Sequence, residues 1–218
     1  MIQGIRLKVC GLTSLVDAEL ADRAGADFLG FVLYPKSPRG VTAAQYRAIA
    51  ALLPDRKKVA VLVEPAEPEL AAAVAAGFDR FQIHFRHDLG AGRVAGWVRA
   101  VGPERVWLAP KLPAGSELPA ELLALAGTFL PDTVHSELFG GSGRTGDWMT
   151  FRRHREAHPD KQWILSGGLT PASIGAALAA TGARWVDVNS GVELAPGVKD
   201  PAKLREFVAG LRDAALVH

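Results

Sequence analysis

Cysteine is nearly absent from this sequence. Only one of the 218 residues, Cys10, is a cysteine, so the chain cannot form an internal disulfide. Chains without disulfides are typical of reducing compartments, and we therefore expect a cytoplasmic protein. Long apolar runs are missing too, because proline, glycine or charge interrupts every stretch before it reaches membrane-spanning length. Residues 1–7 lack the apolar core of a secretory signal, so no membrane partner is expected.

A large excess of either charge is also missing. The chain has 25 Lys and Arg residues against 23 Asp and Glu residues, a formal net charge of +2. Nucleic-acid binding usually needs a strong basic patch, so this balance predicts no nucleic-acid partner. Two histidine pairs have short spacings, His84 with His87 and His154 with His158. Neither pair has further Cys or carboxylate ligands at a recognisable spacing, so we expect no metal site.

What the sequence does contain is a regular alternation of two kinds of segment. Short runs rich in Val, Ile and Phe alternate with segments rich in Ala and Leu. The strands expected are Arg6–Cys10, Asp27–Val32, Lys57–Val63, Arg80–His84, Arg105–Ala109, Gly127–Pro131, Gln162–Leu165 and Arg184–Val188. A strand followed each time by a helix forces the strands to be parallel. An open doubly wound sheet usually stops at about five or six strands. Eight units therefore predict an α/β fold, with residues 1–218 forming a single-domain (βα)8 TIM barrel.

Capping residues mark where several helices should begin. Thr42 is a candidate N-cap, and Gln45 three residues later would complete a capping box. Thr170 before Pro171 is expected to cap a second helix, because proline is favoured in the first helical turn. Asp200 precedes the last helix, in which apolar residues recur at helical spacing, namely Leu204, Phe207, Val208 and Leu211.

The active site of such a barrel lies at the carboxyl ends of its strands. Polar residues stand at several of these ends, at Cys10, at His84 and after the sixth strand at Asp132. Small residues follow the last two strands, where barrels often bind phosphate through backbone N–H groups. We therefore expect a phosphate site at Gly167, Gly168, Ser190 and Gly191, although each of them taken singly is also an ordinary turn residue.

Cys10 and Asp132 are the candidate proton-transfer pair. A lone cysteine is most often a small buried hydrophobe, but a strand end directs it toward the barrel mouth. Period-two alternation puts Lys8 on the same face, where an ammonium group would favour the thiolate. Asp132 follows the apolar residues 129–131, and burial there would raise its pKa, as an acid requires. The alternative for Asp132 is a plain turn aspartate.

One glycine motif matches the pattern of a different kind of site, a dinucleotide-binding loop. Gly141, Gly143 and Gly146 have the spacing of a dinucleotide-binding fingerprint. That fingerprint is meaningful only between a first strand and its helix, whereas this motif follows the sixth strand. We expect instead a flap over the site, with Gly141 and Gly143 near the substrate.

Taken together, these motifs resemble the phosphoribosylanthranilate isomerase family over nearly the whole chain. The matching segments are residues 8–13, Tyr34 to Ser37 with Arg39, Gln82 to His84, Asp132, residues 140–143 with Asp147 and Trp148, Ser166 to Leu169, and Val186 to Glu193. The resemblance implies a cofactor-free Amadori rearrangement of N-(5-phosphoribosyl)anthranilate in tryptophan biosynthesis. The partner would be this small phosphorylated molecule, with the chain a monomer or homodimer.

The resemblance also implies roles for the residues. Asp132 would be the general acid and Cys10 the general base. Arg39 would hold the substrate carboxylate, because the fork of a guanidinium group is suited to a carboxylate. Asp187 would face the substrate. The remaining substrate contacts would be Lys8, His84, Gly141 and Gly143.

The chain departs from the family pattern at several places. Phe85, Arg86 and His87 replace the expected glycine and acidic residues, Pro131 replaces an aliphatic residue, and the fifth strand shows no lysine between Trp107 and Pro110. Two other functions stay open. The histidine-pathway aminoaldose isomerase runs the same chemistry on a related barrel, but Cys10 stands where an aspartate would be expected. A non-catalytic sugar-phosphate-binding barrel would need neither Cys10 nor Asp132.

Overall fold

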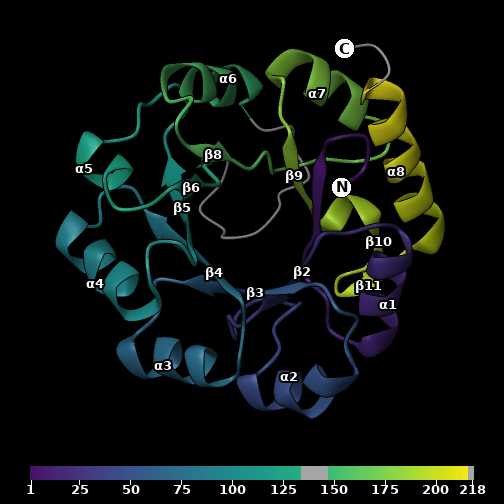
Figure 1. The fold of residues 1–218 in the computed structure, drawn as a ribbon, viewed down its shortest axis with the longest axis horizontal. Coiled ribbons are helices and arrows are strands. Elements are labelled where there is room, and N and C mark those ends of the chain that lie inside the picture. Colours follow the sequence, from purple (N-terminus) through teal and green to yellow (C-terminus); the bar gives the residue numbers. More distant parts are fainter. Residues whose placement is uncertain (134–146, 216–218) are drawn as a thin grey trace.

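A ring of parallel strands forms the centre of the computed structural model, and helices surround it (Figure 1). The structure describes residues 1–133 and 147–215. Its sheet strands are β1 (Arg6–Val9), β2 (Phe28–Val32), β3 (Lys57–Val63), β4 (Arg80–Arg86), β5 (Val106–Leu112), β6 (Thr128–Phe129), β7 (Asp132–Thr133), β8 (Gln162–Trp163) and β9 (Trp185–Val188). Its helices are α1 (Leu15–Arg23), α2 (Ala43–Ile49), η1 (Ala50–Leu52), α3 (Glu67–Ala75), α4 (Ala91–Val101), α5 (Ala120–Leu123), α6 (Trp148–Ala157), α7 (Ile174–Thr181), η2 (Ser190–Val192) and α8 (Pro201–Ala215).

Hydrogen bonds between the last two strand regions close the ring. The strands follow one another in the order β8-β6-β5-β4-β3-β2-β1-β9, and every pair in the sheet is parallel. Just after β8, the N–H of Leu165 donates to the carbonyl of Trp185 (2.9 Å), and Leu165 accepts from the N–H of Asp187 (2.8 Å). The predicted (βα)8 barrel is confirmed.

The sixth barrel strand is divided in two, which the sequence reading missed. β6 and β7 both pair with β5, through Leu108 with Phe129 and through Lys111 with Asp132, in one continuous register. Pro131 lies between the two pieces and has no N–H to donate to the ladder. We expected the strand to end at Pro131, with Asp132 in the following turn. Asp132 belongs to β7 instead, and it is fixed by pairing with β5.

The helix starts agree with the capping signals in part. Thr42 accepts a hydrogen bond from the N–H of Gln45 (3.1 Å), and the capping box is complete. Thr170 was wrong as the N-cap of α7, because that helix begins at Ile174 with Ser173 as its N-cap. The Thr170 hydroxyl accepts from the N–H of Ser173 (3.2 Å), which makes a separate turn before the helix.

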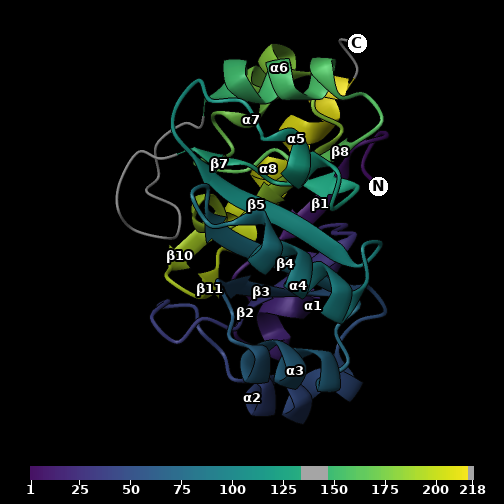
Figure 2. The same ribbon diagram turned by 90° about the vertical axis from the view of Figure 1, so that its left-hand side faces the viewer.

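A short hairpin before α8 was not foreseen. Its strands are β10 (Glu193–Ala195) and β11 (Val198–Lys199), which pair antiparallel. Figure 2 shows this hairpin and β7 at one end of the barrel, with the N-terminus at the other. Because the strands run toward the hairpin, it lies beside the mouth where an active site is expected.

Two apolar cores stabilise the barrel. The larger core lies between the strands and the helices, and α8 contributes the expected stripe to it, Leu204, Phe207, Val208 and Leu211. The smaller core fills the barrel itself. At the bottom of this inner core, Phe28, Trp107 and Trp185 pack ring against ring, with centroids 5.0 to 5.1 Å apart. No helix in the described ranges is both long and apolar enough to cross a membrane.

Candidate active site

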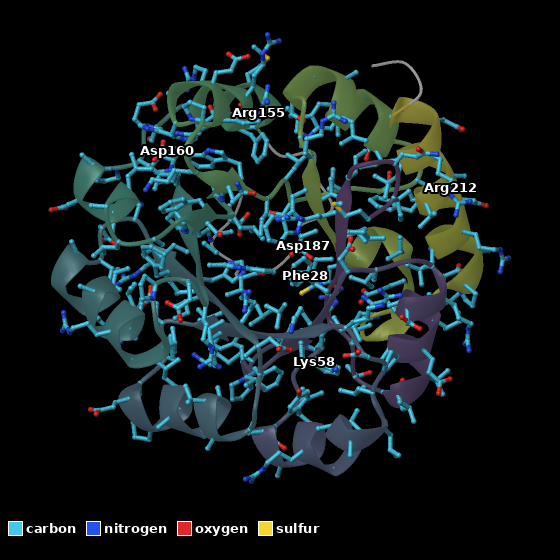
Figure 3. All side chains as sticks on the ribbon, viewed as in Figure 1. Phe28, Lys58, Arg155, Asp160, Asp187 and Arg212 are labelled. Carbon is cyan, nitrogen blue, oxygen red and sulfur yellow. The ribbon has the colours of Figure 1, made fainter. Side chains whose placement is uncertain are left out.

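A cavity of about 340 Å³ opens among the carboxyl ends of the barrel strands. Most of the residues predicted for the site line it together, namely Cys10, Arg39, His84, Asp132, Gly167, Gly168, Asp187 and Ser190. Figure 3 shows Asp187 near the middle of the ring, whereas Arg155, Asp160 and Arg212 lie toward its rim. Alternation along the strands brings His84, Asp132 and Asp187 to the cavity, because every second side chain points into the barrel, and the other residues come from the loops that follow the strands.

The other four predicted residues do not line this cavity in the described part of the chain. Lys8 is fully buried one layer below Cys10, so it supports the cavity from beneath. Gly191 packs behind the loop, where an added Cβ would overlap the carbonyl oxygen of Leu169. Gly141 and Gly143 fall outside the described residues.

A buried ion pair forms the floor of the cavity. The Lys8 ammonium donates to both carboxylate oxygens of Asp187, at 2.9 and 3.0 Å. Gly30 makes room for it, because a Cβ there would come within 2.9 Å of the Lys8 Cε atom. Burial lowers the pKa of Lys8, but the charge of Asp187 and the Cys10 sulfur outweigh burial and raise it overall. Lys8 is therefore an ammonium ion at neutral pH.

Cys10 lies against this pair, and opposing influences set the pKa of its thiol. Burial raises the pKa of the Cys10 thiol, Lys8 lowers it and Asp187 raises it again, so the net direction is upward. Lys8 thus acts on the sulfur as predicted, but Asp187 neutralises much of its charge. The predicted effect of Lys8, which favours the thiolate, is therefore present, and burial together with Asp187 opposes it.

His84 is held as a neutral imidazole beside the cavity. Its Nε2 atom lies 2.8 Å from the Nε2 atom of Gln82, within hydrogen-bond distance. Burial and the positive charge of Lys8 lower the pKa of His84 to about 4. His84 can therefore donate or accept a hydrogen bond at the cavity wall without carrying charge.

Lys111 is a site-region residue that the sequence reading missed. β5 continues past Ala109 to Leu112, and Lys111 pairs in register with Asp132 on β7. Trp107, Ala109 and Lys111 are each two residues apart, which is the spacing of side chains on one face of a strand. The lysine that the family pattern predicts in the fifth strand is therefore present, two residues beyond the predicted end of that strand. Lys111 is buried despite its charge.

Backbone N–H groups form a second feature of the cavity. Gly167 and Gly168 have φ angles of +88° and +64°, a left-handed conformation that favours glycine. Over residues 1–133 and 147–215, the N–H groups of Gly167, Gly168 and Ser190 donate to no backbone or side-chain acceptor. Peptide N–H groups gathered without partners at a cavity wall can bind an anion.

Arg39 reaches the same cavity from the loop before α2, and it already has a partner. Its Nε atom donates to Glu193 at 2.9 Å and its Nη2 atom donates at 2.7 Å. Lys199 donates to the same carboxylate at 2.8 Å. We predicted Arg39 as a substrate contact, but neither Glu193 nor Lys199 was recognised as its support.

Comparison with known proteins identifies the family. The model of the family described as N-(5'-phosphoribosyl)anthranilate (PRA) isomerase matches residues 7–210. The chain belongs to this family. It is 37% identical over 213 residues to the N-(5'-phosphoribosyl)anthranilate isomerase of Zymomonas mobilis, covering 95% of this chain and 98% of that protein. PRA isomerases are enzymes of tryptophan biosynthesis.

Solved structures of PRA isomerases have the same architecture. The enzyme from Thermus thermophilus superposes with a TM-score of 0.79 at 31% identity, covering 96% of this chain and 99% of that one. A further PRA isomerase was solved in complex with reduced 1-(o-carboxyphenylamino)-1-deoxyribulose 5-phosphate. It superposes with a TM-score of 0.71 at 27% identity, with coverage of 96% and 99%. The ligand of that relative is a small molecule with a phosphate and a carboxylate.

Proposed function

We propose that this chain converts N-(5-phosphoribosyl)anthranilate into 1-(2-carboxyphenylamino)-1-deoxyribulose 5-phosphate, with Asp132 as general acid and Cys10 as general base. The observation that carries the proposal is the shared cavity, which a thiol, a carboxyl group and residues whose backbone N–H groups have no partner among the described residues line together. Cys10 follows β1 and Asp132 lies on β7, three barrel positions apart around the ring. A substrate between them has one proton-transfer group on each side.

The two charged groups of the substrate match two parts of the cavity. The phosphate fits the N–H groups of Gly167, Gly168 and Ser190, since glycine lets the backbone approach an anion closely. The anthranilate carboxylate fits Arg39, whose guanidinium can bind two oxygens at once. Binding both ends orients the ribose between Cys10 and Asp132, which lowers the entropic cost of reaching the transition state.

Asp132 acts in the first step. Its carboxyl proton moves to the ribose ring oxygen, the bond from C1 to that oxygen breaks, and the nitrogen lone pair forms a Schiff base with C1. Asp132 is left as a carboxylate. Its position in β7, rather than in a free turn, keeps the carboxyl group at a constant place in the cavity wall.

Cys10 acts in the second step. As a thiolate it takes the proton from C2, the electron pair moves toward the nitrogen, and an enolamine forms that tautomerises to the ketone. The thiol must first lose its proton, and the positive charges of Lys8 and Lys199 favour that loss. Both steps move only protons and bonds within the substrate, so side chains are sufficient to carry them out.

Loss of substrate fluorescence tests this function. We expect the purified protein to consume phosphoribosylanthranilate without added metal or nucleotide. Asp132→Asn and Cys10→Ala should stay folded by circular dichroism and lose about 10² to 10⁴ in kcat, the usual contribution of one acid or base. Asp160→Asn, which removes an exposed carboxylate outside the cavity, is the matched control and should keep full activity. Binding of the reduced product analogue without any turnover by the wild type would favour the non-catalytic barrel instead.

A further inference from the structure

Arg39, Glu193 and Lys199 form a chain of ion pairs at the edge of the cavity. Arg39 donates from Nε (2.9 and 3.1 Å) and from Nη2 (2.7 Å) to the two oxygens of Glu193. Glu193 is buried and Lys199 is fully buried, and these two side chains are 2.8 Å apart. Burial raises the pKa of Glu193, but hydrogen bonds from Arg39 and Lys199 lower it overall, so the carboxylate stays charged.

The pairing leaves a second edge of the guanidinium available. A guanidinium has five N–H donors, and side-on pairing through Nε and Nη2 uses two of them. Within the described part of the chain, Nη1 donates to no residue, and Nη2 keeps a second hydrogen. These two nitrogens form the end-on fork that binds a carboxylate with two hydrogen bonds. Glu193 therefore determines which edge of Arg39 remains for a ligand.

Lys199 adds positive charge and a hydrogen bond to the loop that contains Ser190. An Arg39–Glu193 pair alone is neutral, whereas the three side chains together carry +1, which favours a second carboxylate at Arg39. The Lys199 ammonium also donates to the Oδ1 atom of Asn189 at 3.0 Å. Asn189 directly precedes Ser190. The loop that contains both residues is one of the two proposed to bind the phosphate, and it is called the phosphate loop below. Gly11 lets these parts meet, because a Cβ there would overlap the Asn189 side chain and come within 2.7 Å of the Arg39 Cδ atom.

From this geometry we infer that Glu193 and Lys199 are positioning residues, which hold the end-on fork of Arg39 ready for the substrate carboxylate and connect it to the phosphate loop through Asn189. The inference rests on the proposed function, because it takes the carboxylate as the ligand of Arg39. Neither residue touches the reacting atoms. Their contribution is preorganisation, since a guanidinium that is already oriented loses less conformational entropy on binding.

The hairpin has anchors besides the ion pairs, in addition to the Gly197 N–H, which donates to the Glu193 carboxylate at 3.2 Å. Thr13 donates to the carbonyl of Gly197 at 2.7 Å, and Lys203 donates to the backbone carbonyl of Glu193 at 2.7 Å. Lys203→Met is therefore a matched control, because it removes a lysine contact to the same strand without touching the Glu193 carboxylate.

Binding of two product analogues to the whole protein tests the inference. One is reduced 1-(o-carboxyphenylamino)-1-deoxyribulose 5-phosphate, and the other is the same molecule without the carboxylate. Calorimetry gives Kd for each with wild type, Glu193→Gln, Lys199→Met, Arg39→Gln and Lys203→Met. We expect Glu193→Gln to weaken binding of the carboxylated analogue about tenfold, the loss of about one charge-assisted hydrogen bond. The Kd of the analogue without the carboxylate should change less than about twofold in Glu193→Gln. In Lys203→Met, the Kd values of the two analogues should change by the same factor.

The other variants separate the possible failures. In an Arg39→Gln background, Glu193→Gln should have no further effect on either Kd. Equal weakening of both analogues by Glu193→Gln, or no weakening of either, would overturn the positioning role. Unchanged binding in Arg39→Gln would instead show that the carboxylate assignment of the proposed function is wrong. If Glu193→Gln does not fold, Lys199→Met carries the same carboxylate-specific expectation.

Discussion

Replacing Asp187 with asparagine should turn Cys10 into a thiolate at lower pH. In the wild type the buried Lys8 ammonium pairs with Asp187 at 2.9 Å, and the same carboxylate raises the pKa of the Cys10 thiol. Asparagine keeps the shape of the side chain but not its charge. The thiolate of Cys10 then becomes the anion nearest to Lys8, so the pKa of Cys10 falls.

The size of the shift follows from Coulomb's law. Two unit charges that share a buried site interact by about 2 to 3 kcal/mol in an effective dielectric constant of about 20. Since 1.36 kcal/mol corresponds to about one pKa unit, removing an interaction of this size lowers the pKa of Cys10 by enough for a titration to detect. Removing one member of a buried pair also destabilises the fold, by up to about 3 to 5 kcal/mol when the other charge stays unpaired.

Ultraviolet absorbance of the thiolate measures this pKa directly. The chain has a single cysteine, so the difference spectrum between each protein and its Cys10→Ser counterpart reports one group. Asp160→Asn removes an exposed carboxylate and should leave the titration where it is in the wild type. A Cys10 pKa in Asp187→Asn that is equal to or higher than in the wild type would refute the role given to this carboxylate.

Two further predictions concern the phosphate loop and His84. Gly191→Ala places a methyl group against the carbonyl oxygen of Leu169 and should displace the loop that contains Ser190. Steady-state kinetics should then show a KM for phosphoribosylanthranilate that is raised about tenfold or more. A KM equal to that of the wild type would contradict the assignment of this loop to the phosphate. The folded-state pKa of His84 lies below its unfolded value, so the unfolded chain binds the proton first and stability falls as pH drops from 6.5 toward about 4. His84→Asn should therefore lose less urea resistance over this window than the wild type, and an equal loss in both proteins would show that His84 does not titrate as described.

Most of the barrel could be predicted from local patterns. The eight strand regions were found because apolar runs with β-branched residues alternate with helical stripes, and this alternation depends only on neighbours in sequence. Lys111 could have been found in the same way, since it continues the alternation of Trp107 and Ala109. The predicted strand ends at Ala109, before Pro110, whereas β5 runs on to Leu112. A proline weakens a strand signal without always ending the strand.

The remaining features depend on contacts between distant parts of the chain. Arg39 and Glu193 are 154 residues apart, and no local pattern indicates that they pair. The pKa of Cys10 is a sum over burial and charges on β1, β9 and β11, whose signs oppose one another. Sequence correctly placed Lys8 on the face of Cys10, but it could not show that Asp187 neutralises that ammonium. The roles of Cys10 and Asp132 in catalysis stay predictions.

The fate of the hydrogen at C2 tests the central claim most directly. Substrate deuterated at C2 is given to wild type and to Cys10→Ala in single-turnover experiments, and the C2 deuterium is followed by mass spectrometry. If Cys10 removes this proton, the wild type converts deuterated substrate more slowly than ordinary substrate. Cys10→Ala should leave the deuterium in place over the time in which the wild type removes it completely. Loss of the deuterium from Cys10→Ala at the wild-type rate would contradict the assignment of Cys10 as the base.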